Sequence, residues 1–164
     1  MEVYLLRHGV AEDAAPGTPD ADRPLTAEGQ RKLQHTLQLA SQVGVEPSLI
    51  LTSPLKRTVQ TARIAKEVLK YKGEMLHTKA LAPGSAVEEA WEEIRRHRDQ
   101  SALLLVGHNP QFAELAGYLV GAPEMQIDFK KGAIFRVDIP AFSHRPRGTL
   151  RWYLISKFAP LSQK

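Results

Sequence analysis

Polar side chains able to bind an oxyanion follow three short apolar runs in this sequence. The runs are residues 3–6, 49–51 and 103–106, and the polar residues beyond them are, in chain order, Arg7 and His8, Ser53 and Arg57, and His108. Guanidinium groups, imidazoles and free backbone N–H groups are all partners for an anion that carries several oxygens, above all phosphate. Each residue alone is weak evidence, so the hypothesis of a phosphate site depends on their convergence.

The apolar runs predict buried strands, and helical patterns lie between them. We expect helices from Thr26 to Gly44, Ser53 to about Gly73, Ser85 to about Arg98 and Asn109 to about Gly121, a weak strand at 75–81, and two antiparallel strands at 134–139 and 150–155. Strands that alternate with helices predict an α/β fold, a three-layer α/β/α sandwich with a mostly parallel central sheet. The carboxyl ends of parallel strands meet at one edge, where such folds bind ligands.

The helix starts carry recognisable signals. Thr26, Ser53 and Asn109 are candidate N-caps, the last two followed by proline, and residues 85–88 have the pattern of a capping box with Glu88. Two of these starts directly follow the predicted strands. Their backbone N–H groups would therefore face the same edge of the sheet as the arginines and histidines.

Composition limits the remaining possibilities. With 164 residues and no linker, the chain is expected to be a single domain, residues 1–164. The absence of cysteine excludes a thiol nucleophile, disulfides, iron–sulfur clusters and cysteine zinc sites, and fits a reducing, cytoplasmic location. No apolar run is long enough to span a membrane, and the run at 3–6 is stopped by Arg7-His8 too early for a signal peptide.

The formal charge of +4 is unevenly distributed. Residues 130–164 contain eight basic residues and one acidic residue, Asp138, whereas residues 1–129 are net acidic. A basic end can indicate a nucleic-acid partner. We favour a solvated surface around two strands, because no basic amphipathic helix or nucleic-acid motif accompanies the charge. No nucleic acid or membrane partner is therefore expected.

Several motifs together resemble the histidine phosphatase superfamily, which has the phosphoglycerate-mutase-like fold. The matching segments are Leu6–Gly9, Arg23–Thr26 with Gly29, Ser53–Ala62, and Val106–Pro110. The resemblance extends over residues 1 to about 157. The small size and the Arg7-His8-Gly9-x-Ala start are most similar to the SixA-type phosphohistidine phosphatases.

The resemblance implies roles for the four central residues. His8 would be the nucleophile, forming a phosphohistidine that water then hydrolyses. The attacking nitrogen must be unprotonated, so we expect the other ring nitrogen to donate to a carbonyl group. Arg7 and Arg57 would hold the phosphoryl oxygens, and His108, cationic when substrate is bound, would be a third electrostatic contact.

Other residues near these motifs have less certain roles. Gly9 would let the backbone approach the substrate closely. Arg23 would either reach the phosphate or substrate, or lie on the surface. Ser53 and Asn109 are interpreted as helix caps rather than as a nucleophile and a substrate contact.

One departure from the family pattern bears on the substrate. Many members have a glutamate general acid where this chain has residues 80–84, Ala-Leu-Ala-Pro-Gly, which contain no carboxylate. An imidazole leaving group accepts its proton more readily than an alkoxide, so the departure favours phosphohistidine over an alcohol phosphate. Glu12 or Asp13 could still supply a proton, and Glu88 is assigned to the capping box.

The hypothesis is therefore a phosphatase that needs no metal or cofactor. Its expected partner is a phosphorylated protein, such as a histidine-containing phosphotransfer domain, or a small phosphorylated substrate. The main alternative is a phosphomonoesterase of the same fold acting on a sugar or other metabolite phosphate. A mutase, a non-catalytic phosphoprotein-binding module, a binuclear metal hydrolase and a nucleic-acid binder are less favoured, and the other histidines, His35, His77, His97 and His144, lack metal-ligand spacing.

Overall fold

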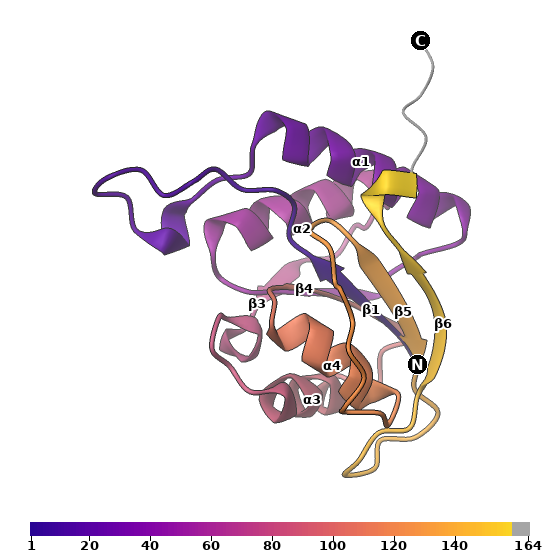
Figure 1. Cartoon of the computed structure of the whole chain (residues 1–164). Helices are drawn as coiled ribbons and strands as arrows, with labels where there is room; N and C mark the ends of the chain where they lie inside the picture. The colour runs from indigo at the N-terminus through magenta and orange to yellow at the C-terminus, as the bar shows by residue number, and fades with distance from the viewer. Residues whose placement is uncertain (159–164) are drawn as a thin grey trace.

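A six-stranded sheet runs through the centre of the protein (Figure 1). The structure is a computed structural model and describes residues 1–158. The strands are β1 (Glu2–Arg7), β2 (Leu49–Thr52), β3 (Met75–His77), β4 (Ala102–Gly107), β5 (Ile134–Asp138) and β6 (Thr149–Leu154), in the spatial order β3-β2-β4-β1-β5-β6. The first four are parallel, β5 is antiparallel to β1, and β6 is antiparallel to β5.

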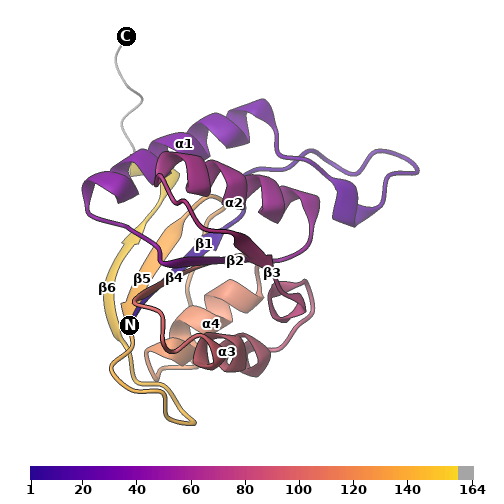
Figure 2. The same cartoon turned by 180° about the vertical axis from the view of Figure 1, so that it is seen from behind.

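Two pairs of helices cover the sheet, one pair on each face (Figures 1 and 2). Helices α1 (Ala27–Gln42) and α2 (Lys56–Val68) lie on one face, and α3 (Val87–Arg96) and α4 (Gln111–Leu119) lie on the other. Short 3₁₀ helices η1 (Asp20–Asp22), η2 (Lys79–Leu81) and η3 (Ser156–Phe158) complete the fold. The predicted three-layer α/β/α sandwich with a mostly parallel sheet is confirmed. No helix in residues 1–158 is both long and apolar enough to cross a membrane.

Strand β1 shows how one strand serves two cores. Val3 and Leu5 pack into the core under α3 and α4, whereas Tyr4 and Leu6 pack into the core under α1 and α2. All four side chains are fully buried. Since successive side chains of a strand point to opposite faces, a continuous apolar run is what a strand covered on both faces requires.

The register of β1 and β4 brings the polar residues after these strands to the same level. Arg7 pairs with Gly107, and the His8 N–H donates to the Gly107 carbonyl oxygen at 3.1 Å. On the other side of β4, the Ser53 N–H donates to the Val106 carbonyl oxygen at 3.0 Å. His8, Ser53 and the residue after Gly107 therefore meet at one edge of the sheet.

Several predicted helix starts are wrong by one to three residues. Thr26 is an N-cap, accepting from the Gly29 N–H at 2.8 Å. Helix α2, however, begins at Lys56 and α4 at Gln111, because the side chains of Ser53 and Asn109 make other contacts, described below.

The predicted capping box of α3 is displaced by one residue. The Ala86 N–H donates to Glu89 at 2.8 Å, so Glu89 rather than Glu88 completes the box. Ser85 instead donates to the Lys79 carbonyl oxygen at 2.7 Å. The strand expected at 75–81 is confirmed only for Met75–His77, because Lys79–Leu81 turn as η2.

Two glycines allow α1 to lie against the segment after β1. A Cβ on Gly29 would stand 2.3 Å from the Val10 carbonyl oxygen, and a Cβ on Gly9 would stand 3.3 Å from the Gly29 carbonyl oxygen. Backbone on both sides leaves little freedom to relax. The contact at Gly9 is with α1, whereas the expected approach of its backbone to a substrate stays a prediction.

We predict that Gly29→Ala destabilises the protein by about 1–3 kcal/mol, because the steric cost exceeds the gain in helix propensity. Urea unfolding measures the change. Gln30→Ala, at the next position of the same helix, is the control and should be neutral or stabilising. Equal stability of Gly29→Ala and the wild type would show that the contact relaxes without cost.

Candidate active site

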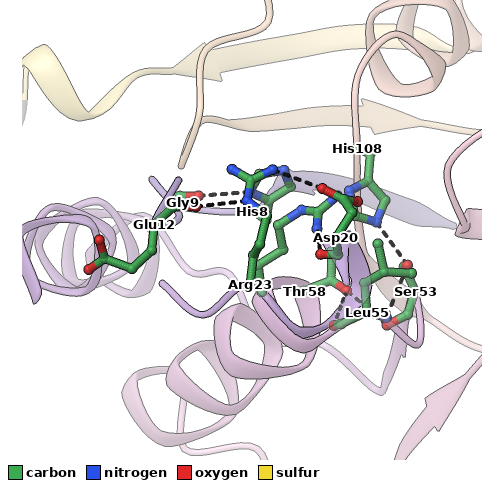
Figure 3. Close-up of polar contacts among 10 residues, drawn as sticks. His8, Gly9, Glu12, Asp20, Arg23, Ser53, Leu55, Thr58 and His108 are labelled. Carbon is green, nitrogen blue, oxygen red and sulfur yellow. Dashed lines mark hydrogen bonds and ion pairs between the residues drawn. The ribbon is translucent and has the colours of Figure 1, made fainter. Parts of the chain in front are cut away.

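His8 lies at the end of β1 with its ring fixed by the backbone (Figure 3). It is 7% exposed, and its Nδ1 donates to the carbonyl oxygen of Gly9 at 2.7 Å. Because a carbonyl oxygen only accepts, the proton must be on Nδ1, and Nε2 of the neutral ring carries a free electron pair. Burial, and to a lesser extent Arg57 and Arg7, lowers the pKa of His8 to about 4. The ring is therefore uncharged at neutral pH, with the electron pair of Nε2 available.

Arg57 and Arg7 provide the positive charge of the site. Arg57 is 7% exposed, in the first turn of α2, and is directed to η1. Arg7 donates through Nη1 to the Phe129 carbonyl oxygen at 2.6 Å, while its Nε is buried with no hydrogen-bond partner in residues 1–158. Burial lowers the pKa of Arg7 from its usual value, although a guanidinium remains charged at neutral pH. A buried guanidinium group, Arg57, and a half-buried one, Arg7, beside a neutral imidazole fit an anion.

His108 faces His8 from the end of β4. The two ring centroids are 5.1 Å apart in an edge-to-face arrangement, and His108 Nε2 lies 2.8 Å from the Ser53 hydroxyl oxygen. Burial, His8 and Arg57 lower the pKa of His108 to about 3, so the ring is neutral while no anion is bound. When the Ser53 hydroxyl donates to Nε2, the ring proton is on Nδ1, a buried atom with no partner in residues 1–158. A neutral His108 can then donate to an anion.

Further hydrogen bonds to backbone groups fix the ends of β1 and β4, from which these side chains extend. The Gly9 N–H donates to Thr61 at 3.2 Å, and the Gly132 N–H lies 3.1 Å and 3.0 Å from the carbonyl oxygens of Arg7 and His8. Asn109 donates to the same Phe129 carbonyl oxygen as Arg7, at 3.1 Å. The interpretation of Asn109 and Ser53 as helix caps is wrong, because the N-caps of α4 and α2 are Pro110 and Leu55. Ser53 accepts from the Leu55 N–H at 3.5 Å and also contacts His108.

Asp20 is a residue of this site that the sequence reasoning missed. Arg57 donates to the Asp20 carbonyl oxygen at 2.9 Å and to its carboxylate at 3.1 Å. Arg23 donates to the other carboxylate oxygen at 2.9 Å and to the Glu12 carbonyl oxygen at 2.7 Å. Arg23 thus reaches the site through Asp20. The three-residue spacing of Asp20 and Arg23 could have indicated an ion pair in the sequence. The same spacing is equally typical of an ion pair on the surface.

The stretch at 80–84 brings no carboxylate to the site, in agreement with its sequence. Gln111, in the first turn of α4, holds this stretch by donating to the carbonyl oxygens of Ala80, Ser85 and Ala86. Glu88 is exposed and lines a separate hollow with Tyr118 and Arg145. In residues 1–158, no group of three histidine or acidic side chains is placed to hold a metal ion.

The lowered pKa values of His8 and His108 predict a loss of stability in acid. Both folded-state values lie below the 6.5 of an unfolded histidine, so the unfolded chain binds more protons between about pH 6.5 and 3, and stability falls as the pH drops through that window. In His8→Asn, the loss between pH 7 and 4.5, measured by urea unfolding, should be smaller by on the order of 2 kcal/mol.

His144→Asn is the control for this experiment, because His144 is exposed and lies in the connection between β5 and β6. It should lose as much stability as the wild type over the same pH range. Identical losses in all three proteins would contradict the buried neutral state of His8.

Comparison with known proteins places the chain in a family. The family described as histidine phosphatase superfamily (branch 1) matches residues 3–82. An uncharacterized protein of Picosynechococcus sp. (strain PCC 7002) is 36% identical over 138 residues, which is 82% of each chain. The matched segment contains His8 and Arg57, and the longer alignment extends the relationship beyond it.

Solved structures agree with the fold. The protein histidine phosphatase SixA in complex with tungstate superposes with a TM-score of 0.87 at 24% identity, over 96% of this chain and 98% of the other. A protein of Agrobacterium tumefaciens proposed to be the phosphohistidine phosphatase SixA gives 0.81 at 25% identity, over 93% and 96%. The family match, the relative and the shared fold together show that this chain belongs to the histidine phosphatase superfamily.

Proposed function

We propose that this protein is a phosphatase that transfers a phosphoryl group to His8 and then to water, and that its substrate is phosphohistidine in a signalling protein. One observation carries the chemistry: the hydrogen bond from His8 Nδ1 to Gly9 leaves Nε2 free, in the midst of Arg7, Arg57 and His108. The SixA structure that binds tungstate, an oxyanion, supports the assignment by analogy.

In the first step, Nε2 of His8 attacks phosphorus and the bond to the leaving group breaks. The proton on Nδ1 stays in place, so the phosphorylated ring is cationic, and the Gly9 carbonyl oxygen stabilises that charge. In the second step, water attacks phosphorus and the ring leaves as neutral imidazole. Because the ring is already neutral and oriented, neither step requires a separate base to activate the histidine.

The cationic groups stabilise the phosphoryl oxygens as charge moves in the transition state. Arg57 and Arg7 present several N–H donors in a fixed geometry, and within residues 1–158 the Nε of Arg7 and the Nδ1 of His108 have no hydrogen-bond partner. Hydrogen bonds to Phe129, Asp20 and Ser53 hold Arg7, Arg57 and His108 before substrate arrives, so little reorganisation is needed when it binds.

Two observations support phosphohistidine as the substrate. Residues 80–84 carry no carboxylate, so an alcohol leaving group would not find the family's usual acid there. Two similar structures are named as SixA phosphohistidine phosphatases. The partner we propose is a histidine-containing phosphotransfer domain.

A small-molecule phosphomonoesterase is the second candidate. The fold is also similar to that of an Escherichia coli protein proposed to be an α-ribazole-5'-phosphate phosphatase, with a TM-score of 0.69 at 21% identity, over 92% of this chain and 94% of the other. A substrate panel separates the candidates: a phosphorylated phosphotransfer domain, phosphoimidazole, and a set of sugar and nucleotide phosphates. A higher kcat/KM for the phosphotransfer domain supports the proposal, and a preference for a sugar phosphate refutes it.

The nucleophile can be identified by trapping. Brief reaction of the wild type with labelled substrate, followed by an alkaline quench, should give an acid-labile phosphohistidine that maps to residue 8. His8→Ala should lose the label and turnover by at least about 10³-fold. His77→Ala, which removes an exposed histidine at the end of β3, should retain both. Turnover that survives in His8→Ala would refute the mechanism.

The role of Arg57 predicts sensitivity to a change that keeps the charge. Arg57→Lys replaces a planar, multidentate donor with a single ammonium, so kcat/KM should fall by about 10²-fold or more. Arg63→Lys, at an exposed position of the same helix, should have no comparable effect. Equal rates in the two variants would show that Arg57 acts only as a distant charge.

A further inference from the structure

The site contains one carboxylate, on Asp20, that the proposed chemistry has not yet used. Its oxygens are paired with Arg57 at 3.1 Å and Arg23 at 2.9 Å, and its side chain remains 60% exposed. It also lies close enough to His108 to affect that ring electrostatically, and Figure 3 shows it in the same cluster as His8, His108 and Ser53. A carboxylate therefore stands at the open side of the anion site.

Anchoring of the loop does not by itself account for this carboxylate. Two backbone carbonyl oxygens already tie the loop down, since Arg57 donates to the carbonyl oxygen of Asp20 and Arg23 to that of Glu12. The carboxylate places a negative charge on the guanidinium that would hold a phosphoryl oxygen. Such a carboxylate competes with the substrate for Arg57. Its presence therefore suggests that it has a role in the reaction after the substrate has bound.

We propose that Asp20 is the acid and base of the reaction, exchanging a proton first with the leaving group and then with water. This inference rests on the proposed function. In the first step the Asp20 carboxyl group gives its proton to the leaving nitrogen or oxygen as the bond to phosphorus breaks and the bond to His8 Nε2 forms. In the second step water attacks phosphorus, its proton passes to the Asp20 carboxylate, and the electron pair of the broken P–N bond returns to Nε2.

The charges around Asp20 change on substrate binding in the direction that the proposal requires. It faces Arg57 from α2, Arg23 from its own loop and His108 from the end of β4, and the two arginines hold its pKa below the usual value while the site is empty. A phosphoryl group on Arg57 would replace attraction with repulsion and raise that pKa. Substrate binding therefore shifts Asp20 toward the protonated acid, and release of phosphate restores the carboxylate.

Glu12 and Asp13, the acids considered from the sequence, do not make this contact. Both side chains are exposed, and Glu12 takes part only through its carbonyl oxygen. Asp22, at the other end of η1, lines a neighbouring hollow of about 380 Å³ with Ala21 and Lys56. Asp22 has the same charge as Asp20 on the same short helix, so Asp22→Asn is a matched control.

The test compares wild type, Asp20→Asn and Asp22→Asn on two aryl phosphates, 4-nitrophenyl phosphate and phenyl phosphate. Asp20→Asn should slow phenyl phosphate, the poorer leaving group, by about 10²-fold or more in single turnover. With 4-nitrophenyl phosphate it should release one equivalent of nitrophenol in a burst and accumulate phosphorylated His8, because water attack has lost its base. Asp22→Asn should behave as the wild type, and thermal melting should show all three folded.

Each other outcome overturns the inference. Equal rates for Asp20→Asn and Asp22→Asn on both esters, with normal turnover of the wild type, refute the role of Asp20 and leave the proposed function intact. Tighter tungstate binding by Asp20→Asn with unchanged turnover makes Asp20 a competitor of the anion and not a proton carrier. A wild type that does not label His8 and hydrolyses neither the two esters nor the phosphorylated phosphotransfer domain refutes the proposed function, and this inference with it.

Discussion

The hydrogen bond from His8 Nδ1 to the Gly9 carbonyl oxygen is the contact on which the rest of the site depends. It decides which ring nitrogen carries the proton, and so which one can attack phosphorus. Burial lowers the pKa of the ring to about 4 and keeps it uncharged. A histidine with the same neighbours but the opposite tautomer would direct a proton, and not an electron pair, at the substrate.

The sheet converts this local arrangement into a site. The parallel register of β1 and β4 puts Arg7 level with Gly107, so the residues that follow, His8 and His108, stand with ring centroids 5.1 Å apart. Packing of its side chains into both cores fixes the position of β1, and so the position of the residues that follow it. This arrangement has a cost, because cationic and imidazole groups are crowded together and two of their nitrogens find no hydrogen-bond partner within residues 1–158. Stability and function therefore make opposing demands on the same residues.

Much of this arrangement follows from sequence, because the apolar runs and the topology of parallel strands are strong constraints. They predict the layers, the order of most elements and the convergence of Arg7, His8, Arg57 and His108. The errors at the starts of α2 and α4 have one physical cause. Ser53 and Asn109 have the side chains and following prolines of helix caps, yet His108 and the Phe129 carbonyl oxygen, both distant in sequence, compete for them. A local pattern cannot reveal a partner brought by the fold.

Asp20 is the sharper example of that limit. Nothing in a run of Ala, Pro, Gly and Asp distinguishes this acid from Asp13 or Asp22, and the link to Arg57 crosses 37 residues. The loop is fixed by its ends: Thr26 N–H donates to the Val10 carbonyl oxygen, and Ala11 pairs with Leu25. Closing the loop in this way places η1 beside the carboxyl ends of the strands. There Arg57 pairs with the carboxylate of Asp20 and not with that of Asp13 or Asp22. The position of Asp20, the proposed acid, is thus set by loop closure, whereas that of His8, the proposed nucleophile, is set by strand β1.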